Sequence, residues 1–104
     1  MAQYDVYINP SNSAATGIPY VVVIQSDLLD GLATRLAVPL AVPDASAKVP
    51  TALCPVIVVK GKRLHALAHF VAPLPCRLLK RPVDNVAAQA GALISAIDAV
   101  LSGI

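Results

Sequence analysis

Long hydrophobic runs are absent from this sequence, although 57% of its 104 residues are hydrophobic and its mean hydropathy is +0.70. No stretch reaches the roughly 18–20 apolar residues that a membrane-spanning helix needs. Five prolines interrupt the most apolar parts: Pro39, Pro43, Pro55, Pro73 and Pro75. The beginning, MAQYDVYI, has no basic segment followed by an apolar one, so we expect no signal peptide and a cytoplasmic protein without membrane contact.

Cysteine is also scarce. Cys54 and Cys76 are the only two, and their spacing is not that of a metal-binding pair. Because a cytoplasmic chain keeps its thiols reduced and cysteine is among the most buried residue types, we expect two free, mostly buried thiols. The sequence predicts no metal site and no cofactor.

Charge is sparse as well: 13% of residues are charged, and a net charge of +2 is too small to indicate nucleic-acid binding. The sequence has no Gly-rich phosphate loop, no GxSxG and no HExxH motif, so it indicates no enzyme class. Aliphatic residues, by contrast, are abundant. A chain of this length forms one domain, residues 1–104, and the apolar excess favours a homodimer or another obligate partner.

The patterning predicts mainly β structure. Alternating and β-branched stretches predict about five short antiparallel strands: residues 3–9, 18–25, 35–42, 52–59 and 63–71, with a further short strand at 76–79 and connections at 10–17, 26–31, 43–50 and 72–75. We expect the first strand to be half-buried and the second to be central. Pro39 places the third strand at an edge or a bulge. A basic turn, Lys60-Gly61-Lys62, joins the last two long strands in a hairpin.

From Val86 the spacing of apolar residues changes to three and four, which predicts an amphipathic helix to the end of the chain. Its apolar stripe, expected to pack on the sheet, comprises Val86, Ala90, Leu93, Ile94, Ile97, Val100 and Leu101. Asp84 or Asn85 is the expected N-cap, because short polar side chains accept hydrogen bonds from free backbone N–H groups. Ile104 carries the terminal carboxylate, which has to stay in water.

Two pairs of residues could carry chemistry, and each has a simpler structural interpretation. His65 and His69 share one face of a predicted strand, but no carboxylate or cysteine of suitable spacing accompanies them, as a metal site would require. Asp27 and Asp30 could form an acid–base pair, but aspartates are also common turn residues. We expect ordinary histidines and turn-forming aspartates.

A ribonuclease is the enzyme alternative. Five residues could surround a phosphate and stabilise the charge that develops on it: Arg35, Lys60, Lys62, Arg63 and His65. The hairpin tip KGKR is the natural place for such a site. Basic hairpin tips are more often only solvated, and this one belongs to no recognisable motif.

The segment VVVIQSDLLDGLATRLAVPL, residues 21–40, carries the most specific pattern. It consists of a β-run, then Gln-Ser-Asp, two aliphatic residues and Asp, then an Arg-containing strand that ends in Pro-Leu. This pattern resembles the corresponding stretch of CcdB toxins. Leu53-Cys54-Pro55-Val56 is similar to the next strand of that family, and the final Gly-Ile also matches, so the resemblance spans nearly the whole chain.

The resemblance implies the CcdB/MazF-like fold, an SH3-like antiparallel β-barrel with a C-terminal α-helix, in a homodimer. It implies a toxin that binds its target and is not an enzyme, neutralised by a CcdA-like antitoxin and reaching DNA only through it. The implied target is the A subunit of DNA gyrase. Carried over by position, the target-binding residues are Ser26, Leu28, Leu29, Asp98, Leu101, Ser102, Gly103 and Ile104.

The end of the chain departs from the family pattern. That pattern ends in an aromatic residue followed by Trp-Gly-Ile, whereas here Leu101 and Ser102 precede Gly-Ile and tryptophan is absent. Asp98 also stands where a neutral polar residue is usual. A buried interface aromatic often contributes about 2 kcal/mol or more to binding. The target is therefore gyrase, bound more weakly, or another protein; the alternatives are a MazF-type endoribonuclease and an inactive antitoxin-binding remnant.

Overall fold

The computed structural model describes residues 2–43 and 53–103, and the structural statements below refer to these residues. They form seven strands and one α-helix: β1 (Asp5–Ile8), β2 (Tyr20–Val23), β3 (Thr34–Ala41), β4 (Val56–Val59), β5 (Lys62–Ala66), β6 (Ala72–Pro75), β7 (Asp84–Asn85) and α1 (Ala90–Ser102). Short 3-10 turns lie between them: η1 (Asn12–Thr16), η2 (Asp27–Leu29), η3 (Ala68–Phe70), η4 (Cys76–Leu78) and η5 (Ala87–Gln89). The expected connection at 43–50 lies, from residue 44 onward, outside the described residues.

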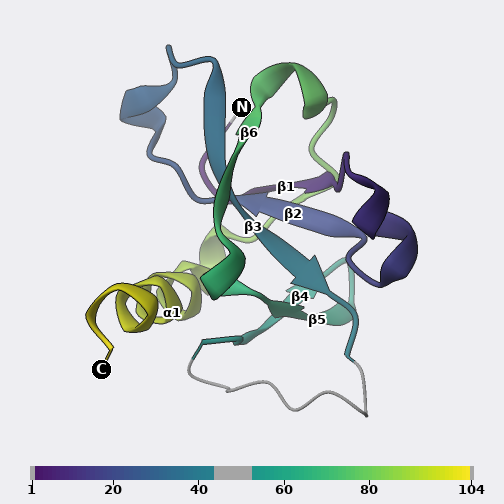
Figure 1. The fold of residues 1–104 in the computed structure, drawn as a ribbon, viewed down its shortest axis with the longest axis vertical. Helices are drawn as coiled ribbons and strands as arrows, with labels where there is room; N and C mark the ends of the chain where they lie inside the picture. The colour runs from purple at the N-terminus through teal and green to yellow at the C-terminus, as the bar shows by residue number, and fades with distance from the viewer. Residues whose placement is uncertain (1, 44–52, 104) are drawn as a thin grey trace.

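The strands make one antiparallel sheet in the order β4-β5-β3-β2-β1-β7, with β6 beside β3. The sheet curls into a nearly closed barrel, and α1 lies at one side of it (Figure 1). Side chains help to bridge the seam between the outer strands, since the carboxylate of Asp84 in β7 accepts a hydrogen bond from the backbone N–H of Lys60 at 3.0 Å. The predicted fold class, mainly β with a C-terminal helix, is confirmed.

Both faces of the central strands are covered by apolar side chains. In β2, Val22 belongs to the cluster that includes Leu93 of α1, while Val21 and Val23 belong to a second cluster on the other face. The prediction of a central second strand is confirmed. The prediction of a half-buried first strand is wrong, because Asp5, Val6 and Tyr7 are all buried and Ile8 is exposed. The second cluster covers the face that the alternation assigned to solvent.

The β4–β5 hairpin matches its prediction closely. Lys60 and Gly61 form the turn, and both have positive φ angles, 49° and 79°. Positive φ at both positions is the type I′ geometry, which fits the twist of two-residue hairpins. The second strand is shorter than predicted, however, because β5 ends at Ala66 and the chain turns into η3.

The sixth strand lies earlier than predicted. Residues 72–75, APLP, form β6 and pair with β3, whereas residues 76–78 form a 3-10 turn. Proline is tolerated in a strand that has a neighbour on only one side, because the missing N–H can face away from the ladder. The two prolines therefore mark an edge strand and not a break.

Pro39 lies in a central strand, so the prediction of an edge or bulge is wrong. On one side β3 pairs with β2, and on the other with β6 through residues 34–37 and with β5 through residues 40–41. The backbone of Pro39 faces this second side, since its carbonyl accepts from Leu67 N. It therefore falls between the stretches of β3 that pair with β6 and with β5, where the missing N–H of proline breaks neither pairing.

Helix α1 begins at Ala90, four residues later than predicted. The expected N-cap, Asp84 or Asn85, is wrong, because the N-cap of α1 is Gln89, which makes no side-chain cap bond; Asn85 Oδ1 accepts instead from Ala87 N in η5. The buried face of α1 consists of Leu93 and Ala96, so the predicted apolar stripe is partly wrong. Ile94 and Leu101, both assigned to that stripe, are 51% and 79% exposed.

Candidate protein-docking surface

The QSDLLD turn presents two leucines to solvent. Ser26 Oγ accepts from Leu28 N at 3.2 Å, and Asp27 Oδ1 accepts from the backbone N–H of Gln3 at 2.8 Å. Leu28 is 94% exposed and Leu29 49% exposed. The polar residues of this motif thus hold the backbone, as expected of turn-forming aspartates, while the aliphatic residues face outward.

The last turn of α1 forms a second exposed element. Ser102 Oγ donates to the carbonyl of Asp98 at 2.7 Å, and Gly103, with a φ angle of 73°, ends the helix by donating its N–H to Ala99 O at 2.9 Å. Glycine adopts such a left-handed conformation without steric cost. Asp98, Leu101, Ser102 and Gly103 are all exposed. Ile104, the eighth residue of the expected site, lies outside the described residues.

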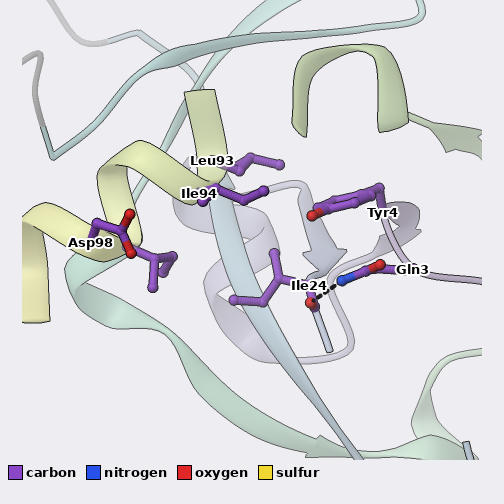
Figure 2. A pocket seen from close by; sticks show the side chains of 7 residues that line it. Gln3, Tyr4, Ile24, Leu93, Ile94 and Asp98 are labelled. Atoms are coloured by element: carbon purple, nitrogen blue, oxygen red, sulfur yellow. Dashed lines mark hydrogen bonds between the residues drawn. The ribbon is translucent and has the colours of Figure 1, made fainter. Parts of the chain in front are cut away.

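An apolar hollow of about 230 Å³ lies beside α1. Its walls come from the residues just before β1, the residue just after β2 and α1: Gln3, Tyr4, Ile24, Leu93, Ile94, Ile97 and Asp98 (Figure 2). Gln3 Nε2 donates to Ile24 O at 3.0 Å, which joins two of the segments that line the hollow. Asp98 is the one charged residue of this wall.

The structure thus divides the expected docking surface into two parts. Figure 1 shows the η2 turn, the blue turn at the upper left, well separated from the end of α1 at the lower left. Of the expected docking residues that the structure describes, only Asp98 lines the hollow. Sequence reasoning missed Tyr4 and Ile24, for which it had no signal, and it assigned Ile94 to the core.

The two histidines do not share a strand face, because His65 lies in β5 and His69 in η3. Both contact Cys54: His65 Nδ1 is 3.2 Å from its carbonyl oxygen, and His69 Nδ1 is 3.8 Å from its Sγ. Burial raises the pKa of the Cys54 thiol, so it stays protonated at neutral pH. Cys54 and Cys76 are both free, as predicted, with Cys54 buried and Cys76 half-buried. Within residues 2–43 and 53–103, no group of three or more His, Cys, Asp or Glu side chains could hold a metal ion.

The basic residues of the ribonuclease alternative differ in environment. Lys60, Lys62 and Arg63 are exposed on the β4–β5 hairpin. Arg35 is only 6% exposed, and its guanidinium bonds the Asp30 carboxylate and the backbone carbonyls of the segment after η2, those of Asp30, Leu32 and Thr34. Its hydrogen-bond donors are therefore directed at the protein itself and not at a phosphate.

The fold and its surface define a class: a small antiparallel barrel with one terminal helix and exposed aliphatic side chains. Among the described residues, no helix has both the length and the apolar character that spanning a membrane requires. The family model described as "CcdB protein" matches residues 3–103, essentially the whole chain. The chain belongs to the CcdB family. Membership makes it a toxin of a toxin–antitoxin system, a class of binding proteins with an antitoxin partner and a protein target. A comparison with curated proteins gives no match.

Proposed function

We propose that this toxin acts by docking on the A subunit of DNA gyrase. The observation that carries the proposal is the exposure of aliphatic side chains on the two elements that correspond to the contact surface of the family, Leu28 at 94% and Leu101 at 79%. Both side chains are free to contact a partner, and burying them on binding would contribute favourably. The contact residues on the described part of the chain are Ser26, Leu28, Leu29, Asp98, Leu101, Ser102 and Gly103, and Ile104 completes the proposed set.

Ser102 is the main argument for a weaker complex than the family pattern would give. A serine offers little apolar area, and interface aromatics often contribute about 2 kcal/mol or more. Leu101, 79% exposed, supplies aliphatic area next to Ser102 on the same helix. We therefore expect a measurable but weaker gyrase complex, in which aliphatic contacts replace the aromatic anchor.

A homodimer and a CcdA-like antitoxin complete the proposal. The half-exposed Ile94 and the adjoining hollow are suited to contact with a second copy, because burying exposed aliphatic area drives association. The antitoxin covers the docking surface and carries the pair to DNA, which this chain does not bind by itself. Gyrase acts on DNA in the cytoplasm, so we place the toxin there.

The proposal is tested by inducible expression without antitoxin. We expect growth arrest, relief of the arrest on deletion of residues 102–104, and capture of the gyrase A subunit by the intact purified chain only. Lys62→Ala, which changes an exposed hairpin residue far from the terminus in sequence, is the control and should remain toxic. Equal toxicity of the truncated chain would contradict a role for the C-terminal surface, and arrest without gyrase capture would indicate another protein target.

The two alternatives predict different results in the same set of experiments. A ribonuclease would cleave RNA in vitro, and both Lys62→Ala and Arg35→Ala would reduce that cleavage. The effect of Arg35→Ala would be indirect, because the Arg35 guanidinium is buried against its own backbone segment. An inactive remnant would bind the antitoxin without arresting growth. The binding toxin should cleave no RNA and should arrest growth.

A further inference from the structure

The segment that directly follows the η2 turn, from its C-cap Asp30 to Thr34, is held by a buried cation. The guanidinium of Arg35 donates from Nη1 to the carbonyls of Leu32 at 2.6 Å and Thr34 at 2.9 Å. From Nη2 it donates to the carbonyl of Asp30 at 2.6 Å and to Asp30 Oδ1 at 2.8 Å. The Arg35 side chain is 7% exposed and that of Asp30 is 62% exposed. Since guanidinium bonds are directional and charge-assisted, they fix the C-cap of η2 and the residues that follow it relative to β3, and so limit how far the turn can move.

A second clamp acts on the same turn. Gln25 Nε2 donates to the carbonyl of Thr34 at 3.1 Å and, at 3.4 Å, to that of Leu29, while its Oε1 accepts from Leu36 N at 2.9 Å. None of the residues of η2 is buried. Polar side chains, and not apolar packing, therefore order this turn.

The fixed position of Leu28 does not stabilise the folded chain. A side chain that is 94% exposed in the folded chain gains almost nothing from folding by burial. Holding it in one place does reduce the entropy that a docking partner would otherwise have to remove. A clamped turn with a free leucine at its tip is thus arranged for binding.

We propose that Arg35 and Asp30 form a positioning pair for target docking. They fix the η2 turn so that Leu28 is presented to the target in one orientation, and they act through Leu28. This inference rests on the proposed function, because it assigns a task to residues behind the proposed docking surface. It predicts that loosening the pair weakens docking even when Leu28 itself is unchanged.

The test uses Asp30→Ala, because the Asp30 side chain is mostly exposed and its removal leaves no cavity. By amide hydrogen exchange of the full chain, we expect residues 26–33 to exchange about tenfold faster or more, with the strands unchanged. Growth arrest should then require several-fold more protein. Arg35→Lys, which keeps the charge but loses the planar guanidinium, should also speed exchange and weaken the arrest. Asp30→Glu, which keeps the carboxylate, should weaken the arrest less than Asp30→Ala. Lys62→Ala is the control and should change neither reading.

A double-mutant cycle separates positioning from a purely structural role. If Asp30 acts through Leu28, adding Asp30→Ala to Leu28→Ala should weaken the arrest no further than Leu28→Ala alone. Additive effects, an unchanged exchange rate in residues 26–33, faster exchange throughout the strands, or undiminished arrest by Asp30→Ala would each overturn the positioning role. If the unaltered chain fails to arrest growth, the proposed function fails and the positioning role falls with it. That outcome differs from full arrest by Asp30→Ala, which overturns the positioning role alone.

Discussion

The side-chain amide of Gln89 forms a strand-like pair with the backbone of Val58. Its Oε1 accepts from Val58 N at 2.8 Å, and its Nε2 donates to Val58 O at 2.8 Å. Val58 lies in β4, the outermost strand on its side of the sheet, and the backbone groups of such a strand that face away from its one neighbour lack a ladder partner. Gln89 belongs to η5, which leads into α1, so the helix is tied to the open edge of the barrel by one side chain.

Replacing Gln89 by alanine should destabilise the fold moderately. Two hydrogen bonds of this kind contribute net about 1–2 kcal/mol together, and their partly exposed setting favours the lower value. We expect urea denaturation of Gln89→Ala to show a free energy of unfolding lower by about 1 kcal/mol. Ser95→Ala, at an exposed position of α1, is the matched control and should change it by less than about 0.5 kcal/mol. Equal stability of the two variants would show that the Gln89–Val58 pair adds nothing.

Adjacent positions of α1 should respond very differently to truncation. Leu93 is 1% exposed and belongs to the main core cluster, whereas Ile94 is 51% exposed. Leu93→Ala should lower the free energy of unfolding by about 2–5 kcal/mol, because it leaves a cavity. Ile94→Ala should change it little at low protein concentration but should weaken self-association in sedimentation experiments. Similar losses of stability for both variants would contradict the observed orientation of the helix.

Tyr7 should make the protein sensitive to high pH. Burial, and then the nearby carboxylate of Asp5, raises the pKa of Tyr7 above its usual value of 10.0. Above pH 10.0 the unfolded chain releases the phenolic proton while the folded chain retains it, so the free energy of unfolding falls as pH rises through this range. Tyr7→Phe keeps the ring and removes the titration. Its stability, measured by urea denaturation at several alkaline pH values, should fall less steeply than that of the unaltered chain, and parallel curves would contradict this prediction.

The two cysteines should differ in reactivity. Cys54 is 1% exposed, and burial raises its pKa, whereas Cys76 is partly exposed. Because the thiolate is the reactive form and needs access to the reagent, we expect iodoacetamide to alkylate Cys76 first in the folded protein. Peptide mass spectrometry follows both sites, and the difference should disappear in denaturant. Faster labelling of Cys54 without denaturant would mean that the segment around it opens readily.

Local chemistry made several features predictable. A Lys-Gly pair between two β-branched stretches predicts the β4–β5 hairpin, because few residue pairs tolerate positive φ twice. The QSDLLD pattern predicts a turn for the same local reason, since Ser26 Oγ accepts from Leu28 N; the bond from Gln3 N to Asp27, 24 residues apart, is a tertiary contact. The start of α1 was less predictable, because Asn85 caps a 3-10 turn before the helix proper.

The sequence by itself determined the five long strands, the hairpin, the terminal helix and the family, because these depend on residues close together in the chain or on a shared pattern of residue types, whereas it misplaced β6 and missed β7. Only the tertiary structure decided which apolar residues are buried. Ile94 and Leu93 are indistinguishable as aliphatic residues on a helix, and the contact of α1 with the sheet selects Leu93. The same holds for Arg35, a cation that could have faced a phosphate but is buried against its own turn. Burial depends on which surfaces meet, and residues distant in the sequence supply those surfaces.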